Sequence, residues 1–279
     1  MFRLAHISDP HLPPPPGMGP LAELVSKRTL SRLAWRRKQE QHQPAVLAAV
    51  VGDLKAHAPD HVAVTGDLTN FATPAEFAAA RAWLETLGTP GEVTVSPGNH
   101  DALVMAREAA RRAALGPWFG DEDTQEFPRV RRRGPVALVN LSSAVATPPL
   151  FASGRLGQGQ LARLAQALED LGRAGLFRIV LLHHPVGAGV VSARKALSDA
   201  PALREVLRRH GAELVLHGHA HEPVFGALPG PGGPVPVLGA SSASSPGGGR
   251  HAAARWHAIE IEDGAMQVTA RGVDATGAL

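Results

Sequence analysis

Apolar β-type runs alternate with helical patterns along most of the chain, and this alternation limits the fold more than any other feature. Six runs are recognisable, and each ends in polar residues: Arg3–Ser8, His61–Thr65, Glu92–Ser96, Val136–Ser142, Phe177–Leu182 and Glu213–Leu216. Alanine- and leucine-rich helical patterns lie between most of them, at 44–57, 74–87, 101–114, 158–172 and 201–210. Strands that alternate with helices predict an α/β architecture with a mainly parallel central sheet.

Local sequence signals indicate where one helix begins and which secondary structure the C-terminal part adopts. One expected helix has Thr73 as N-cap, Pro74 at its first position and Glu76 completing a capping box. After about residue 222, Pro- and Gly-rich turns separate the segments VPVLGAS, RWHAIEIE and AMQVTAR, with a tight loop expected at 229–234. These segments predict a mainly β C-terminal part, either a second sheet or an antiparallel extension. We expect one domain over 1–279.

Composition excludes several kinds of chemistry. The chain has no cysteine, which rules out disulfides, zinc fingers, Fe–S clusters and thiol catalysis. The formal charge is only +3, and the pI of 9.9 reflects 24 arginines against 4 lysines, so no nucleic-acid partner is required. The first residues are too few and too polar for a signal peptide, and no run of 18 apolar residues follows. We therefore expect a cytoplasmic protein.

Polar side chains of metal-binding types gather where the apolar runs end. In open α/β sheets, functional residues lie beyond the carboxyl ends of the strands. Five of the six runs end in clustered Asp, Asn and His, whereas the fourth ends in serines. The clusters are Ser8-Asp9-Pro10-His11, Gly66-Asp67, Gly98-Asn99-His100-Asp101, His183-His184-Pro185 and His217-Gly218-His219-Ala220-His221. Each alone could be a turn or a helix cap, but the set indicates a functional site.

The residue types in these clusters point to metal chemistry. Oxygen and imidazole ligands without cysteine suit borderline divalent ions such as Mn, Fe, Zn, Co or Ni. Two carboxylates, an amide oxygen and at least four imidazoles exceed the needs of one tetrahedral ion but are enough for two. Two ions roughly 3.5–4 Å apart can clamp the attacking and leaving oxygens of an in-line displacement. The sequence therefore predicts a dinuclear metal site.

In this order, the blocks resemble the calcineurin-like metallophosphoesterase superfamily, whose pattern is D-x-H, G-D, G-N-H-[DE], a strand-end His and G-H-x-H. The matching residues span 4–221, and the resemblance implies an αββα fold, a two-sheet β-sandwich flanked by helices. It also implies that one metal is held by Asp9, His11, Asp67 and His221. The other is held by Asp67, Asn99, His183 and His219, with Asp67 and a nucleophilic hydroxide bridging the pair.

Two further residues receive catalytic roles from the same resemblance. His100 is expected not to bind metal, but to stabilise the phosphoryl oxygens or protonate the leaving alkoxide, and Asp101 is expected to orient it. Gly98 is expected to let the backbone turn sharply. His184 either faces the pocket or caps the turn before Pro185. His217 is interpreted as a buried sheet histidine or a neighbour of the substrate.

A basic amphipathic insertion is predicted at about 13–40, between the first strand and its following helix. Its basic residues are Lys27, Arg28, Arg32, Arg36, Arg37 and Lys38, opposed by Glu23 and, at its end, Glu40. One interpretation is a solvated surface helix. The alternative is a lid over 17–40 that recruits an anionic lipid head group or lies on the inner membrane surface. It resembles the arrangement in pyrophosphatases of this superfamily that cleave UDP-diacylglucosamine. A second cluster, Arg129 with Arg131–Arg133, is predicted to be a surface turn.

The resemblance implies a metal-dependent enzyme that hydrolyses a phosphodiester, phosphomonoester or pyrophosphate bond in a phosphorylated small molecule or lipid-linked substrate. The segments His-His-Pro and TGDLTN look most like bacterial cyclic-nucleotide and glycerophosphodiester phosphodiesterases. One alternative is a nuclease of the same superfamily, which scarce aromatic residues and the lack of tyrosine disfavour. A non-catalytic metal-binding module is the other, disfavoured because every ligand position is filled. The sequence leaves the substrate, the metal and the oligomeric state open.

Overall fold

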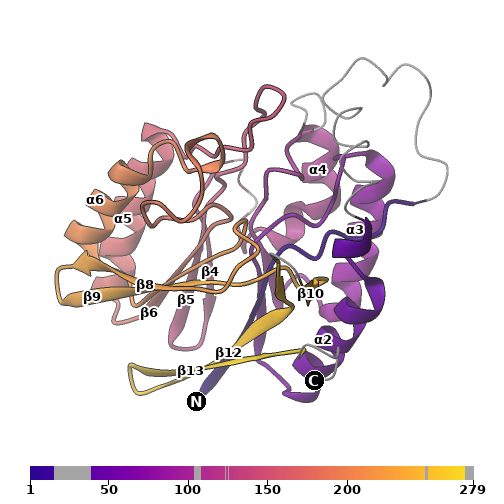
Figure 1. The fold of residues 1–279 in the computed structure, drawn as a ribbon. Helices are drawn as coiled ribbons and strands as arrows, with labels where there is room; N and C mark the ends of the chain where they lie inside the picture. Colours follow the sequence, from indigo (N-terminus) through magenta and orange to yellow (C-terminus); the bar gives the residue numbers. More distant parts are fainter. Residues whose placement is uncertain (16–38, 104–107, 123, 125, 249–250, 274–279) are drawn as a thin grey trace.

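Two β-sheets pack face to face between two layers of helices in the computed structural model, which describes residues 1–15, 39–103, 108–122, 124, 126–248 and 251–273 (Figure 1). The first sheet has the order β13-β12-β1-β2-β3. Its strands are β1 (Phe2–Ile7), β2 (His61–Val64), β3 (Val93–Val95), β12 (Arg255–Glu262) and β13 (Ala265–Gly272). β1, β2 and β3 are parallel, and β12 and β13 add antiparallel strands at one edge.

The second sheet has the order β4-β5-β6-β7-β9-β8. Its strands are β4 (Arg129–Arg133), β5 (Val136–Asn140), β6 (Phe177–Leu181), β7 (Leu214–His217), β8 (Val224–Gly230) and β9 (Gly233–Gly239). β5, β6, β7 and β9 run parallel, with antiparallel strands at both edges. A small hairpin, β10 (Pro246–Gly248) with β11 (His251–Ala253), lies outside both sheets.

The helices cover the outer faces of the two sheets (Figure 1). Those on the first sheet are α2 (Pro44–Ala56), α3 (Pro74–Leu87) and α4 (Glu108–Leu115), and those on the second are α5 (Gln158–Arg173) and α6 (Ala200–His210). Single 3₁₀ turns lie at Gln39–Gln41, Gly116–Trp118 and Ala193–Lys195. Three apolar clusters result, one under each helix layer and one between the sheets, where Leu4 and Ile259 meet Leu138 and Ile179.

The predicted α/β fold of two sheets flanked by helices is confirmed, because all six predicted strands form within two residues of the expected bounds. The C-terminal part is made of strands, as predicted, but it joins both sheets rather than one. β12 and β13 extend the first sheet, whereas β9 lies parallel to β7 in the second. The tight loop expected at 229–234 forms as the tip of the β8–β9 hairpin. The helix expected at 101–114 begins only at Glu108 among the described residues.

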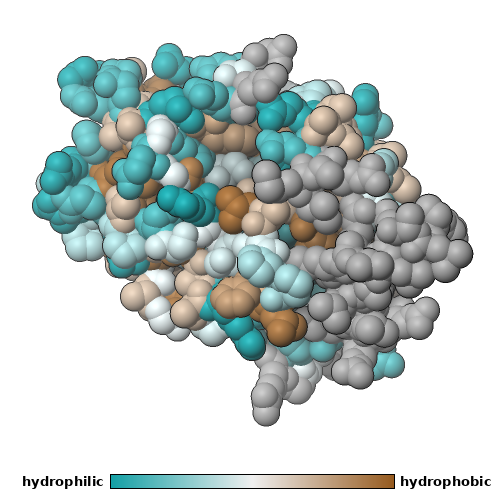
Figure 2. Space-filling view, turned by 90° about the horizontal axis from the view of Figure 1, so that it is seen from above, coloured by the Kyte–Doolittle hydropathy of each residue, from teal (hydrophilic) through white to brown (hydrophobic). Residues whose placement is uncertain are grey.

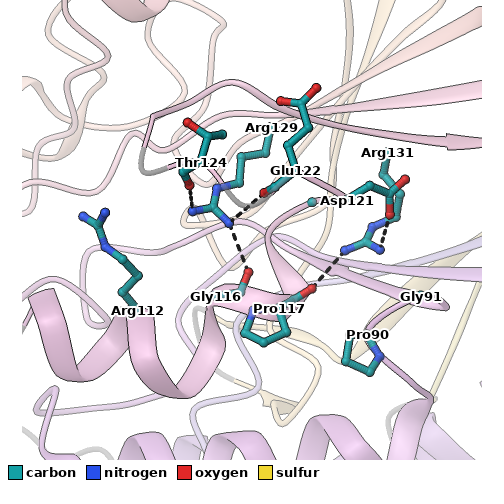
Figure 3. Close-up of a pocket in the computed structure, with 11 residues that line it drawn as sticks. Pro90, Gly91, Arg112, Gly116, Pro117, Asp121, Glu122, Thr124, Arg129 and Arg131 are labelled. Atoms are coloured by element: carbon teal, nitrogen blue, oxygen red, sulfur yellow. Dashed lines mark hydrogen bonds and ion pairs between the residues drawn. The ribbon is translucent and has the colours of Figure 1, made fainter.

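The arginine cluster predicted to be a surface turn is in fact the edge strand β4, and Arg129 and Arg131 are buried. The guanidinium of Arg129 donates hydrogen bonds to the carbonyls of Gly116 and Thr124, and Arg131 pairs with Asp121 at 2.7 Å (Figure 3). These side chains line a cavity of about 590 Å³, and none of the predicted site residues is part of its lining. The prediction failed because a buried guanidinium needs hydrogen-bond acceptors, and residues of the preceding 116–124 segment supply them only once that segment packs against β4.

The start of α3 follows the predicted capping box and also organises the loop before it. Thr73 Oγ1 accepts from the backbone N–H of Glu76, and the carboxylate of Glu76 accepts from the N–H of Thr73. The same carboxylate accepts from the N–H groups of Asn70 and Phe71, at 2.9 and 3.1 Å. Glu76 is therefore a buried anchor for the turn that follows β2.

Most of the predicted insertion at 13–40 lies outside the described residues. In the part of the chain that the structure does describe, no helix combines the length and the apolar character needed to cross a bilayer.

Replacing Thr73 with Ala removes the cap of α3. We expect the free energy of unfolding to fall by about 1 kcal/mol, the usual cost of losing a Thr N-cap, measured by urea denaturation. Thr86→Ala near the other end of the same helix is the matched control, because its exposed hydroxyl bonds only the carbonyl of Trp83. An equal loss in both variants would show that the cap contributes nothing specific.

Candidate metal centre

The predicted site residues lie together where the carboxyl ends of the parallel strands of both sheets meet. Asp9 and His11 follow β1, Asp67 follows β2, and the 96–101 segment follows β3. From the second sheet, His183 follows β6, and His219 and His221 follow β7. Figure 2 looks onto this end of the molecule, where the described surface is mostly hydrophilic with small apolar patches between.

One group of side-chain atoms converges from β3, β6 and β7 around Asp67 Oδ2. His183 Nδ1 must donate to the Thr65 carbonyl at 2.7 Å, so in a neutral ring Nε2 carries the lone pair. His219 Nε2 donates to the Lys195 carbonyl at 2.9 Å, which leaves the lone pair on Nδ1. The two lone-pair nitrogens lie 3.2 Å apart. Asn99 Oδ1 lies 3.1 Å from His183 Nε2. Acceptors that converge in this way are typical of a cation site.

A second group converges from β1 and β7 on the other side of Asp67. His11 Nδ1 faces Asn70 Oδ1 at 3.1 Å, so His11 Nε2 points to the interior of the site. That atom lies 3.3 Å from His221 Nε2 and 3.8 Å from Asp67 Oδ2. His221 Nε2 lies 3.2 Å from Asp9 Oδ1. The donor atoms of Asp9, His11 and Asp67 all lie within 4.8 Å of one another.

Asp67 lies between the two groups. Its Oδ1 accepts from the backbone N–H of His100 at 2.8 Å, and its Oδ2 faces His183 at 3.3 Å. Burial disfavours the charged carboxylate, but the surrounding imidazoles, His183 foremost, hold the pKa of Asp67 well below its ordinary value. Burial likewise opposes the charged form of His183, yet Asp67 raises the pKa of this ring to about 9. A cation bound there would take the place of the His183 proton.

The backbone at these positions is strained. Five of the seven predicted ligands have positive φ: Asp9, His11, Asp67, His219 and His221. Such a conformation is uncommon for residues other than glycine and is concentrated at functional sites. Gly218 is needed for close approach, because a Cβ there would overlap Ser8 Oγ. Gly98 is also needed for close approach, because a Cβ there would overlap the Asp67 carboxylate, and its φ is not positive.

Asp101 does not hold the His100 ring directly, contrary to the sequence prediction. Its two oxygens accept from the backbone N–H groups of Asp67, Gly98 and Thr69, at 2.9–3.0 Å, and from the Thr69 hydroxyl. Burial and the nearby charge of Asp67 raise the pKa of this carboxyl, and the hydrogen bonds from Gly98 and Thr69 oppose that rise. Asp101 therefore fixes the peptides that carry Asp67. The His100 ring is oriented instead by its Nδ1, which donates to the Asn70 carbonyl at 3.0 Å.

Sequence reasoning missed Asn70, although it had singled out the TGDLTN segment. Asn70 contacts His100 through its carbonyl and His11 through its amide oxygen, while its amide NH₂ donates to the Leu12 carbonyl at 2.7 Å. The available signal was the Asn that ends the TGDLTN segment, three residues after Asp67. His42 was also missed, and its ring nitrogen lies within 4.8 Å of those of His11 and His221.

The two histidines with open roles are both buried and held by the protein. His184 Nδ1 contacts Ser143 Oγ at 2.8 Å and its Nε2 contacts the Ala152 carbonyl at 3.1 Å, so its ring ties two loops together. His217 Nδ1 donates to the Gly218 carbonyl at 3.0 Å. Burial lowers the pKa of His217 to about 4 and that of His184 to about 3. The structure therefore favours a buried sheet histidine for His217, whereas the ring contacts of His184 are made to Ser143 and Ala152 and not to the turn before Pro185.

Comparison with known proteins identifies the class. The family model for calcineurin-like phosphoesterases matches residues 2–223, and the chain belongs to this family. It is therefore a metal-dependent phosphoric ester hydrolase. It is 30% identical, over 81% of its length and 82% of the relative's, to a probable cyclic nucleotide phosphodiesterase of Synechococcus sp..

Solved structures agree with this fold. A dimetal phosphatase from Danio rerio superposes with a TM-score of 0.59 at 14% identity, covering 97% of this chain and 96% of the other. The purple acid phosphatase PPD1 from yellow lupin gives 0.60 at 12% identity, over 97% of this chain and 51% of its own. At these identities the likeness establishes the arrangement of sheets and helices.

Asp101→Asn should destabilise the protein. An amide can accept at only one of the two oxygen positions, so its NH₂ would oppose backbone donors that are buried. We expect the free energy of unfolding to fall by about 1–3 kcal/mol, measured by denaturant titration, whereas Asp263→Asn in the exposed β12–β13 turn should change little. Unaltered stability of Asp101→Asn would contradict the four-bond anchor.

Asp67→Asn keeps the shape of the side chain and the acceptor for the His100 N–H, but removes the shared negative charge. If Asp67 bridges two ions, the variant should bind no more than one equivalent of Mn²⁺ where the wild-type protein binds two. Equilibrium dialysis with metal analysis measures this, and Asp170→Asn on the surface of α5 is the control. Two retained equivalents would exclude the bridge.

Proposed function

We propose that the protein hydrolyses a phosphodiester with the help of two divalent cations, and that cyclic nucleotides are its substrate class. The observation that carries this proposal is the pair of acceptor groups that share Asp67 Oδ2, which lies 3.3 Å from His183 Nε2 and 3.8 Å from His11 Nε2. The name of the Synechococcus relative, a probable cyclic nucleotide phosphodiesterase, supports the choice of substrate class.

The donor set fits two borderline divalent cations. Asp9, His11, Asp67 and His221 would hold the first, and Asp67, Asn99, His183 and His219 the second. Nitrogen and oxygen donors without thiolates suit Mn, Fe, Zn, Co or Ni. When bound, such a pair supplies a hydroxide near neutral pH and neutralises charge on the phosphoryl oxygens.

His100 is assigned to the leaving group. Its Nδ1–H is held by the Asn70 carbonyl, so Nε2 points away from that anchor, and the ring lies edge-on to His11 at 5.0 Å between centroids. The residue is partly exposed, which lets a substrate reach it. A proton at Nε2 could pass to the departing oxygen, and the ring would return to the neutral state. Asp101 supports this geometry through the backbone.

The substrate is identified by a panel. Protein loaded with Mn, Fe, Co, Ni or Zn is assayed on bis-p-nitrophenyl phosphate, cyclic nucleotides, a glycerophosphodiester and UDP-diacylglucosamine. Cyclic nucleotides should give the highest kcat/KM. The lipid-linked substrate tests the interpretation of residues 17–40 as a membrane-facing lid, and all of this segment except residues 39 and 40 lies outside the described residues. If deletion of 17–40 leaves liposome binding and turnover of this substrate unchanged, that interpretation is wrong.

His100→Ala should retain both metal equivalents but lose roughly 10²-fold or more in kcat, the usual range for a general acid. A substrate with a good leaving group such as p-nitrophenolate should suffer less than a cyclic nucleotide, because it needs less protonation. The control is His251→Ala in the exposed hairpin strand β11, which should keep full activity. Full activity of His100→Ala on cyclic nucleotides would show that the assigned role is wrong.

A further inference from the structure

His42 is a buried histidine beside the first acceptor group that no sequence motif predicted. It lies two residues before α2, and only 9% of its surface is exposed. The centroid of its ring is 4.3 Å from that of His11 and 5.6 Å from that of His221. One ring nitrogen from each of these three residues lies within 4.8 Å of the other two. Two buried imidazoles and the half-buried ring of His221 in one corner are unusual for a packing role, because each brings a polar atom that must be satisfied.

The C-terminal segment 242–245 holds His42 in place. The backbone N–H of Gln43 donates to the Ser244 carbonyl at 2.8 Å, and His42 Nδ1 contacts Ser244 Oγ at 2.9 Å. The same segment is fixed to the end of β1, because the N–H of Ala243 donates to the Ser8 carbonyl at 2.9 Å. His42 therefore has the rigid support expected of a residue in a site.

A chain of hydroxyl groups indicates which nitrogen of His42 carries the proton. Ser242 Oγ donates its proton to the Asp9 carbonyl at 2.7 Å. Toward its other neighbours it can therefore only accept, either from Ser244 Oγ at 3.2 Å or from His42 Nδ1 at 3.4 Å. If it accepts from His42, Nδ1 carries the hydrogen directly. If Ser244 donates to Ser242, it must accept from His42 Nδ1, which then carries the hydrogen. The lone pair of the neutral ring is then on Nε2, at the far side of the ring from the serines.

We propose that His42 is an additional nitrogen ligand of the first metal, beside Asp9, His11, Asp67 and His221; this inference rests on the proposed two-metal site. The arrangement matches known metal-ligating histidines, which donate the second ring N–H to a protein acceptor that fixes the tautomer. Nitrogen ligands about 2.1 Å from one ion lie roughly 3–4.2 Å apart, so a small adjustment within the observed 4.8 Å brings all three imidazoles onto it.

The proposal makes the two metal positions unequal. The first would have five protein donors, three of them imidazoles, and the second would have four. More donors and more nitrogen favour tighter binding of ions such as Co²⁺, Ni²⁺ or Zn²⁺. The first position should therefore fill before the second when metal is limiting.

The test follows Co²⁺ binding to metal-free protein by calorimetry and by visible absorption, which responds to the number and kind of ligands. The wild-type protein should bind two equivalents, the tighter at the first position. His42→Ala should weaken the tighter site by about 100-fold or more and change its absorption spectrum. Ser244→Ala keeps the ring but removes its support, and should weaken the same site by about 10-fold, within the range for such partners. The matched control is His57→Ala at the other end of α2, which should bind as the wild type does.

The outcomes separate the two proposals. If the wild-type protein binds no Co²⁺ or only one equivalent, the two-metal proposal fails, and this inference with it. If the wild type binds two but His42→Ala has the same affinities and spectrum, His42 is not a ligand. Unchanged metal binding with a raised KM would likewise overturn the proposal and make His42 a substrate contact. Circular dichroism checks that each variant is folded. If His42→Ala is unfolded, the Ser244→Ala variant decides: unchanged Co²⁺ binding by that variant would contradict the proposed support of the His42 ring by Ser244.

Discussion

The carboxylate of Asp67 is the group on which the arrangement of the whole site depends. Asp67 follows β2 of the first sheet, but its Oδ2 faces His183, which follows β6 of the second sheet, and its Oδ1 accepts from the backbone N–H of His100. Asp101 fixes the peptide of Asp67, and Gly98 lacks a side chain that would collide with it. The two sheets must therefore pack in one register for the site to exist.

This geometry has an energetic cost that the rest of the fold must offset. Five predicted ligands adopt positive φ, and for residues other than glycine such a conformation costs about 1–2 kcal/mol each. The buried apolar clusters under both helix layers and between the sheets hold these strand ends in place. The strain lies in the short turns immediately after the strands, where the backbone must bend to aim side chains from two sheets at common points.

A structural feature could be predicted from the sequence when the pattern that specifies it lies within one short segment of the chain. The strands and the polar residues at their ends were predicted because alternation and strand termination are local patterns. Asn70 and His42 were missed because their contacts come from chain segments far away in sequence. Arg129 was misplaced for a different reason, since its acceptors, the carbonyls of Gly116 and Thr124, are near in sequence but become available only when that segment folds over β4. A single domain with an insertion at about 13–40 stays a prediction, as do the metal ligands.

The segment 242–245 links the family motifs to a part of the chain beyond them. The family match ends at residue 223, yet Ser242 holds the Asp9 carbonyl and Ser244 holds His42. The motif-bearing part of the chain is therefore not an interchangeable module. A chimera that joined this part to the C-terminal strands of a relative would need hydroxyl side chains at positions 242 and 244. Where the relative lacks them, the residues just before α2, which include His42, would have to be exchanged as well.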